Sequence, residues 1–469
     1  MLDLLITNGT VITMDPARRV LEPGTVAVEG ERIVAVGGPE EFAQATARRV
    51  IDASGMCVIP GLLDSHGHAG HSLTKTIAEG PSHNWLAVVE DIYLRYSTED
   101  FWFVEAQLGA LERLRFGVTC GYSMLGNMPR ADDPVYSIRH MEGAKTVGIR
   151  DILGIGPANP PWPKTCASWI DGKRVTYETD LETALTTTQK VLDVWRKGNF
   201  GRVLVHVSPS RIGDLPGLSP SVTKHQTDEV VRLAKEYGVT INSHAYGGNI
   251  KYAYERLDVL GPNVVLAHCT GITDEEVRIL AGTGTNVSHC PSARAYSRDR
   301  CPAVELIEAG ANVALGTDGT GPDRTFDLFK DMRAAILLHR AYFRDSSYLP
   351  PGKVIEMVTV DSAKALGLDK DLGSLEPKRL ADIVLVNAQR PHLYPWSMPV
   401  HRMVYETSGQ DVDTVIVGGK ILMEAGKVIS INEESVLRAA QREYELALER
   451  SGNWKSQAIP DKFWGKARY

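Results

Sequence analysis

Four residues with metal-binding side chains follow short apolar runs at widely separated places in the chain. Two histidines form the segment His66-Gly-His68, and His244 and Asp318 follow later runs. In an extended chain, residues i and i+2 point the same way, so His66 and His68 can both bind one ion. Three imidazoles and one carboxylate suit zinc, with iron, cobalt or manganese as alternatives. The pattern predicts one divalent ion bound by His66, His68, His244 and Asp318.

Two residues that follow apolar runs, Asp318 and His268, are also candidates for catalysis. Asp318, as a ligand and hydrogen-bond acceptor, could take a proton from water and pass it to a leaving group. His268 follows another apolar run, Leu266-Ala. It could polarise a substrate or stabilise a developing oxyanion. Asp318 and His268 are therefore predicted as the catalytic pair.

The elements that must position these residues alternate between strand and helix. Helix signals include a capping box at 273–276 and an acidic start at 227–229. Eight such strands favour a closed parallel (β/α)8 barrel of the TIM type, in which chemistry lies at the carboxyl ends of the strands. The apolar runs predicted as strands are Cys57–Leu63, Val118–Ser123, Ile149–Ile155, Val203–Val207, Val239–Asn242, Val264–Ala267, Asn286–Ser288 and Asn312–Gly316.

Both ends of the chain have the pattern of antiparallel β-structure. Asn8-Gly9 predicts a hairpin within residues 2–14, and further hairpins are predicted at 29–31 and at Gly418-Gly419. We therefore expect an accessory β-sandwich built from both termini, beside the α/β barrel. The predicted divisions are 1–56 and 371–430 for the accessory domain, 57–370 for the barrel and 431–469 for a C-terminal helix and tail.

Composition limits the classes of partner. The 469 residues are 43% hydrophobic and 23% charged, with a net charge of −7, which argues against nucleic acid or an anionic membrane as the main partner. The sequence shows neither a signal-peptide pattern nor a run of roughly 20 apolar residues. These features favour a cytoplasmic enzyme acting on a small molecule. The charged helix near 433–449 is a candidate subunit contact, so we expect a homo-oligomer.

The motifs resemble the amidohydrolase superfamily. The resemblance rests on the segment 60–68, on His244, His268 and Gly316-Thr-Asp318, and on 289–292, which is similar to a motif of the triazine hydrolase and cytosine deaminase-like branch. It implies a β/α barrel and a divalent ion that activates water. Binuclear members use a lysine from the fourth strand, but residues 202–211 contain none, which favours a single ion.

One departure from that branch bears on the substrate. Its deaminases carry a glutamate three residues after the histidine equivalent to His244, whereas this chain has Gly247. That glutamate protonates the ring, so its absence favours hydrolysis of a carbonyl C–N or C–S bond in an amide, urea or (thio)carbamate. In this departure the chain resembles phenylurea hydrolases and molinate hydrolase. The alternatives are an aminohydrolase or dechlorinase acting on a triazine or pyrimidine, and a metal-free structural relative.

Five further residues are candidates for substrate binding because they follow predicted strands, where barrel loops form pockets. Arg211 could bind a carbonyl or carboxylate, although a surface ion pair is the simpler interpretation. His289 could orient a neighbour, or be structural. The full predicted set is Arg211, Tyr246, Trp85, Trp162 and His289.

Overall fold

Parallel strands in the middle of the chain form a barrel, as the alternating pattern predicts. The computed structural model describes residues 1–77, 85–126, 130–295, 299–457, 459 and 463–465. The barrel closes between its first and last strands, where Gly67 bridges to Asp318 and the amide of Ser65 donates to the carbonyl of Leu315 (3.1 Å). Among the described residues its strands, in spatial order, are β6 (Leu62–Asp64), β8 (Val118–Leu125), β9 (Arg150–Ile155), β12 (Val203–Val207), β13 (Ile241–Tyr246), β14 (Val264–Thr270), β15 (Asn286–His289) and β16 (Val313–Leu315), with β7 (His68–Ala69) paired to β8.

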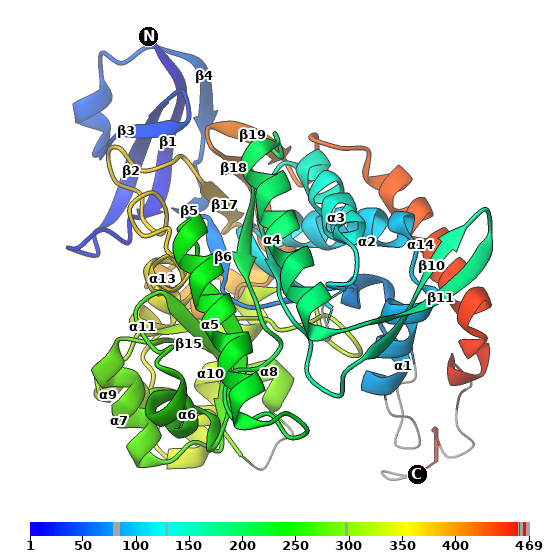
Figure 1. Cartoon of the computed structure of the whole chain (residues 1–469). Coiled ribbons are helices and arrows are strands. Elements are labelled where there is room, and N and C mark those ends of the chain that lie inside the picture. Colours follow the sequence, from blue (N-terminus) through cyan, green and yellow to red (C-terminus); the bar gives the residue numbers. More distant parts are fainter. Residues whose placement is uncertain (78–84, 127–129, 296–298, 458, 460–462, 466–469) are drawn as a thin grey trace.

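Helices follow the strands and surround the barrel (Figure 1). The capping box predicted at 273–276 begins α7, with Thr273 and Glu276 bonded reciprocally. The larger helices are α2 (Glu99–Arg115), α3 (Pro134–Val147), α4 (Leu181–Lys197), α5 (Pro220–Tyr237), α7 (Asp274–Thr283), α10 (Leu328–Phe343) and α14 (Glu433–Ser451). The shorter ones are α1 (Trp85–Asp91), α6 (Asn249–Tyr252), α8 (Pro291–Arg294), α9 (Ala303–Glu308), α11 (Pro351–Met357), α12 (Val360–Ala365) and α13 (Pro399–Tyr405).

The two ends of the chain form a second sheet beside the barrel. In Figure 1 the blue N-terminal strands and the β17–β19 strands from near the C-terminus lie in this part of the molecule. Its core includes Leu4, Ile33 and Ile383, all buried. The described strands join into one hydrogen-bonded sheet: β1 (Leu2–Ile12), β2 (Val20–Glu29), β3 (Arg32–Gly37), β4 (Ala47–Asp52), β5 (Met56–Pro60), β17 (Ile383–Asn387), β18 (Val412–Val417), β19 (Lys420–Glu424) and β20 (Lys427–Val428).

Two predicted β-elements differ from the structure. The predicted first barrel strand, Cys57–Leu63, is divided at Gly61, because its first half pairs with β1 and β17 in the terminal sheet. The hairpin predicted at Asn8-Gly9 is wrong, since β1 continues through these residues with an irregular register. A β-carbon on Gly9 would lie 2.7 Å from Val58 Cγ2, so this glycine permits close packing of strands instead of a turn.

The hairpins predicted at 29–31 and 418–419 are confirmed, with left-handed glycines at both turns. Helix α5 begins at Pro220 with a Ser219 cap, seven residues before the acidic start predicted at 227. A two-stranded hairpin, β10 (Lys164–Ile170) and β11 (Lys173–Thr179), projects after β9. Within the described residues no helix is long and apolar enough to cross a membrane. Part of the predicted C-terminal tail, including 466–469, lies outside the described residues.

Candidate metal centre and surrounding cavity

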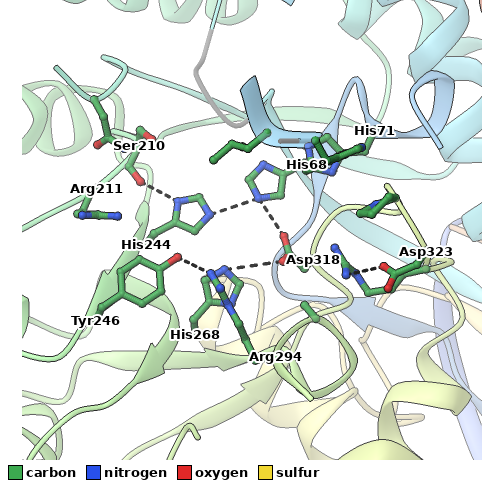
Figure 2. A pocket seen from close by; sticks show the side chains of 16 residues that line it. His68, His71, Ser210, Arg211, His244, Tyr246, His268, Arg294, Asp318 and Asp323 are labelled. Carbon is green, nitrogen blue, oxygen red and sulfur yellow. Dashed lines mark hydrogen bonds and ion pairs between the residues drawn. The ribbon is translucent and has the colours of Figure 1, made fainter. Parts of the chain in front are cut away.

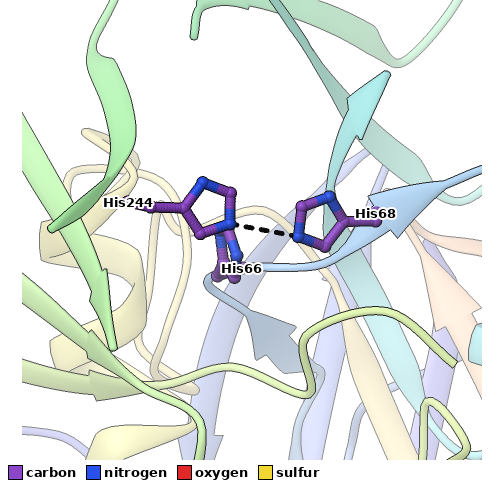
Figure 3. Close-up of side chains that lie close together, drawn as sticks. All are labelled: His66, His68 and His244. Atoms are coloured by element: carbon purple, nitrogen blue, oxygen red, sulfur yellow. Dashed lines mark hydrogen bonds between the residues drawn. The ribbon is translucent and has the colours of Figure 1, made fainter. Parts of the chain in front are cut away.

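Three histidines from two distant parts of the chain converge at one mouth of the barrel (Figure 3). His66 and His68 follow β6, and His244 lies within β13. The ring centroid of His66 is 4.9 Å from that of His68 and 4.9 Å from that of His244. The Nε2 atoms of His68 and His244 are 3.3 Å apart. The side chains therefore present nitrogen atoms to one shared space.

Asp318 and His268 complete this cluster. Asp318 follows β16, and its Oδ1 lies 3.0 Å from His68 Nε2 and 3.8 Å from His66 Nε2. The second oxygen, Oδ2, is 3.8 Å from Nε2 of His268 in β14. His66, His268 and Asp318 form a second group with ligand spacing, sharing His66 with the first. The structure thus brings together all five residues predicted as ligands or catalytic groups.

Backbone carbonyls orient two of the imidazoles. Nδ1 of His68 faces the carbonyl oxygen of Gly126 at 3.1 Å, and Nδ1 of His244 faces that of Ser210 at 2.7 Å. A carbonyl can only accept, so each Nδ1 carries the proton and donates it. This leaves Nε2 as the atom directed at the shared space, which is the usual arrangement of a metal-bound histidine.

The unpartnered atoms of the cluster fit a metal ion. Among the described residues, both ring nitrogens of the fully buried His66 lack a hydrogen-bond partner, as does Nδ1 of His268. Buried polar atoms are normally paired, because an unpaired one loses its interactions with water. An ion in the shared space would bind one of the two ring nitrogens of His66, and imidazole nitrogen is a donor that zinc prefers.

Burial and mutual contacts set the charges of the cluster. Burial, with His244 and His68 adding to it, lowers the pKa of His66 well below its usual value. Burial, followed by the effect of His68, lowers the pKa of His244 to about 3. Burial alone would raise the pKa of Asp318, but contacts with His268 and His68 outweigh it and hold that pKa well below its usual value. Neutral imidazoles and an ionised carboxylate are the forms that bind metals.

Two members of the cluster have left-handed backbones. The φ angles are 72° at His268 and 62° at Asp318, conformations that non-glycine residues adopt rarely. Gly67, between His66 and His68, packs closely against Arg113. A β-carbon at residue 67 would lie only 2.6 Å from an Nη atom of that arginine. Strained or crowded backbone of this kind is concentrated at functional sites, where the surrounding structure holds it in place.

A buried ion network supports the cluster from below. Arg113 of α2 lies 3.3 Å from a carboxylate oxygen of Asp64 and 3.4 Å from one of Asp151. Asp64 also accepts hydrogen bonds from the amide (2.9 Å) and hydroxyl (2.8 Å) of Thr317, the residue before Asp318. The network therefore fixes the loop that carries the aspartate of the cluster.

The cluster opens into a cavity of about 380 Å³ (Figure 2). Three of the predicted substrate-binding residues line it, namely Arg211, Tyr246 and Trp85. The other two do not. Trp162 lies in the lining of a separate small cavity near Lys164, and His289 is buried against His339, with their Nε2 atoms 3.3 Å apart.

Several residues that line the cavity were not predicted from the sequence. Arg294 at the end of α8 lies just beyond the 289–292 motif, and its side chain donates to the hydroxyl of Tyr246 at 2.6 Å. Asn159, Asp323 and Arg324 also contribute to the lining. All of these residues follow barrel strands, so a search of every strand-following segment for polar side chains could have found them.

The barrel and the histidine–aspartate cluster together define a metal-dependent hydrolase, and comparisons with known proteins specify the class further. The profile of the amidohydrolase family matches residues 57–422, so the chain belongs to this family. It is an enzyme that hydrolyses carbon–nitrogen bonds other than peptide bonds.

Curated relatives match nearly the whole chain. A 5-methylthioadenosine/S-adenosylhomocysteine deaminase of Syntrophobacter fumaroxidans is 29% identical over 447 residues, covering 93% of this chain and 96% of the relative. A 5'-deoxyadenosine deaminase of Methanosarcina acetivorans is 30% identical over 462 residues, covering 96% of this chain and 100% of the relative.

Solved structures share the fold. An adenosine deaminase from Xanthomonas campestris with bound zinc has a TM-score of 0.81 at 23% identity, covering 96% of this chain and 99% of that chain. A mutant of atrazine chlorohydrolase from Arthrobacter aurescens TC1, complexed with zinc and atraton, has a TM-score of 0.78 at 23% identity. The match covers 94% of this chain and 100% of that chain. Both similarities extend over barrel and terminal sheet alike.

Proposed function

We propose that this enzyme is a metal-dependent aminohydrolase that replaces an amino group on an electron-poor nitrogen heterocycle with the oxygen of water. The observation that carries the proposal is the His66–His68–His244–Asp318 cluster at the base of a cavity large enough for a heterocycle. Similarity over the whole chain to nucleoside deaminases favours this chemistry over the urea and carbamate hydrolysis expected from the sequence. A heterocycle that loses chloride is the closest variant of the same reaction.

His66, His68, His244 and Asp318 would hold one divalent ion, and zinc is the metal present in both structural relatives described above. A single ion is proposed because β12 and the residues after it, up to Arg211, supply no lysine to bridge a second. When bound, the ion would supply the acidity that makes a water molecule nucleophilic at neutral pH.

Asp318 would transfer the proton, and His268 would orient the substrate. Asp318, ionised at neutral pH, would accept a proton from the attacking water as its oxygen bonds to the ring carbon. The same proton would then pass to the leaving amine, which departs as ammonia when the carbon–nitrogen bond breaks. His268, whose Nε2 lies 3.8 Å from Asp318 Oδ2, would donate a hydrogen bond to the nitrogen or oxygen atom attached to the reacting carbon. The net reaction consumes one water and releases one ammonia.

One observation favours a second candidate, hydrolysis of a carbonyl C–N or C–S bond in a urea, amide or thiocarbamate. Deaminases of this branch use a glutamate at the position of Gly247. Here a β-carbon at residue 247 would lie only 2.2 Å from the carbonyl oxygen of Gly271, so no side chain fits without moving the backbone. A carbonyl substrate needs no ring protonation, since donors such as His268 could stabilise its oxygen.

The deciding experiment combines metal analysis with turnover of both substrate classes. The purified protein should contain about one metal ion per chain, and His244→Ala should contain far less. Ammonia release from a heterocyclic amine such as S-adenosylhomocysteine, the substrate named for one relative, is expected. A phenylurea and a thiocarbamate should release no aniline or thiol. Release of aniline or thiol without ammonia would transfer the assignment to the second candidate.

Removal of the metal provides the control for that assay. Treatment with a chelator should abolish turnover, and adding zinc back should restore it. Full activity in a preparation shown by elemental analysis to contain no metal would contradict the proposed mechanism for both candidates.

A further inference from the structure

Two arginines that line the cavity have no acidic partner within the part of the chain that the structure describes. Arg211 follows β12 and Arg294 ends α8, and both line the cavity. Among the described residues, neither forms an ion pair with a carboxylate, and Nε of each is buried without a hydrogen-bond partner. An unpaired charge that is partly withdrawn from water is costly, so such groups normally have a counter-charge.

Both guanidinium groups converge on Tyr246 (Figure 2). The Cζ atom of Arg211 lies 5.0 Å from the centre of the tyrosine ring, and that of Arg294 lies 5.2 Å from it. Arg294 also donates to the tyrosine hydroxyl at 2.6 Å. A tyrosine side chain carries no charge at neutral pH, since a phenol of this type ordinarily ionises only at about pH 10. It therefore positions the two cations without neutralising them.

The other charged groups of the cavity are already paired. Arg324 lies 2.8 Å from a carboxylate oxygen of Asp323 and donates to the carbonyls of Gly319 and Gly321. The carboxylate of Asp318 belongs to the proposed ligand set, with its Oδ1 3.0 Å from Nε2 of His68. The uncompensated positive charge of the described cavity is therefore confined to Arg211 and Arg294, in a chain whose net charge is −7.

We propose that the substrate carries an oxyanion, a carboxylate or a phosphate, which Arg211 and Arg294 bind beside Tyr246 while the reacting carbon faces Asp318. Guanidinium groups suit this role because their planar donors match the oxygens of carboxylate and phosphate. The inference rests on the proposed function only in taking this cavity as the substrate site. It narrows the substrate to an acidic compound of either proposed reaction class.

Binding of small anions tests the inference without turnover. Phenylacetate and phenyl phosphate are titrated into the zinc-loaded protein by calorimetry, with phenylacetamide as the neutral analogue of the carboxylate. At least one anion should bind tenfold or more tightly than the amide, and the tighter of the two identifies the group. Arg211→Gln and Arg294→Gln should each weaken that anion about tenfold while changing amide binding less than threefold.

A matched control and a rescue variant make the test specific. Arg324→Gln removes a guanidinium of the same cavity whose charge is already paired, so it should weaken anion binding less than threefold. Arg294→Lys should restore part of the affinity lost in Arg294→Gln, and thermal melting confirms that each variant is folded. Metal content should be unchanged in all of them.

Several results would overturn the inference. Equal binding of anions and amide would do so, and so would an equal loss in the Arg324→Gln control. Anion binding that disappears with the chelated metal yet persists in both glutamine variants would assign it to the ion instead. Anion binding without turnover of any heterocycle would refute the proposed aminohydrolase but leave this inference standing.

Discussion

Two buried polar regions meet at the mouth of the barrel and differ in how their groups are paired. In the lower region, Arg113 lies against Asp64 and Asp151, and His140 lies 2.9 Å from the other oxygen of Asp151. In the upper region, four imidazoles surround the single carboxylate of Asp318, and both ring nitrogens of His66 lack partners among the described residues.

This difference separates structural support from a binding site. Opposite charges in the Arg113 network lie against one another, so its charges are compensated within the chain. The histidine cluster has more ligand atoms than the protein itself can satisfy, which is the arrangement expected where an ion binds. We therefore expect changes in the lower region to affect mainly folding, and changes in the upper region to affect mainly catalysis.

The largest effect is expected for Asp318→Asn in the upper region. The amide cannot accept the proton of water, so turnover per bound metal should fall about a thousandfold or more, equivalent to about 4 kcal/mol. The free energy of unfolding should change by less than about 1 kcal/mol. Steady-state kinetics at saturating zinc, with metal content measured on the same sample, tests this. Near-normal turnover per metal would remove Asp318 from the proton-transfer role.

For Arg113→Met in the lower region, we expect a large loss of stability. The substitution leaves Asp64 and Asp151 buried without their cation, which should lower the free energy of unfolding by about 3–5 kcal/mol. Arg115→Met is a control on the same helix, because its partly exposed ion pair with Glu433 should contribute less than about 1 kcal/mol. Denaturant unfolding measures both variants. Equal losses would mean that the buried network is not a special source of stability.

The pH dependence of stability should also come from the lower region. Burial alone would lower the pKa of His140, but the carboxylates of Asp151 and Glu105 outweigh it and raise that pKa to about 9. Because the folded-state pKa lies above the unfolded value near 6.5, the stabilisation is complete below pH 6.5 and is lost as pH rises through 9. The loss should approach about 3 kcal/mol.

Unfolding at pH 6.5 and pH 9.5 tests this, with His140→Gln as the comparison. The difference in unfolding free energy between wild type and variant should be large at pH 6.5 and much smaller at pH 9.5. Parallel pH curves for the two proteins would show that His140 does not titrate in this range.

The smallest effect is expected at the junction of the two regions. Thr317→Val removes the hydroxyl bonded to Asp64 and keeps the shape of the side chain. We expect a loss of about 1–3 kcal/mol in unfolding free energy, from one hydrogen bond to a charged group. Turnover should fall about tenfold because Asp318 is held less firmly. Thr317→Ser keeps the hydroxyl and should behave as wild type; if both variants lose activity equally, packing rather than this bond positions Asp318.

Much of the fold and of the central cluster could be predicted from the sequence. The alternation of apolar runs with amphipathic helices indicated the barrel, because strand and helix have different hydrophobic periods. His66, His68, His244, His268 and Asp318 could be found because each follows or ends such a run, and parallel strands bring their carboxyl ends to one mouth. These inferences need only local patterns and one general rule of topology.

Other features depended on contacts that no local pattern contains. Gly9 lies within a strand because Val58, far along the chain, packs against it, and the segment predicted as the first barrel strand is divided because its first half pairs with β1 and β17. Side-chain direction likewise decided which polar residues line the cavity. Residues Trp162 and His289 follow or end strands like Trp85 and Arg211, yet only the latter two face it.

The sequence by itself thus determined the barrel, the terminal β-structure and the residues able to bind a metal, since periodicity and residue type are local properties. The tertiary structure alone decided how charges are paired. Arg113, Arg211, Arg294 and Arg324 are the same residue type. Among the described residues, the first and last have carboxylate partners and the other two do not. Pairing is set by distances between atoms remote in sequence, and in a buried site it determines whether a charge stabilises the fold or is left to bind a ligand.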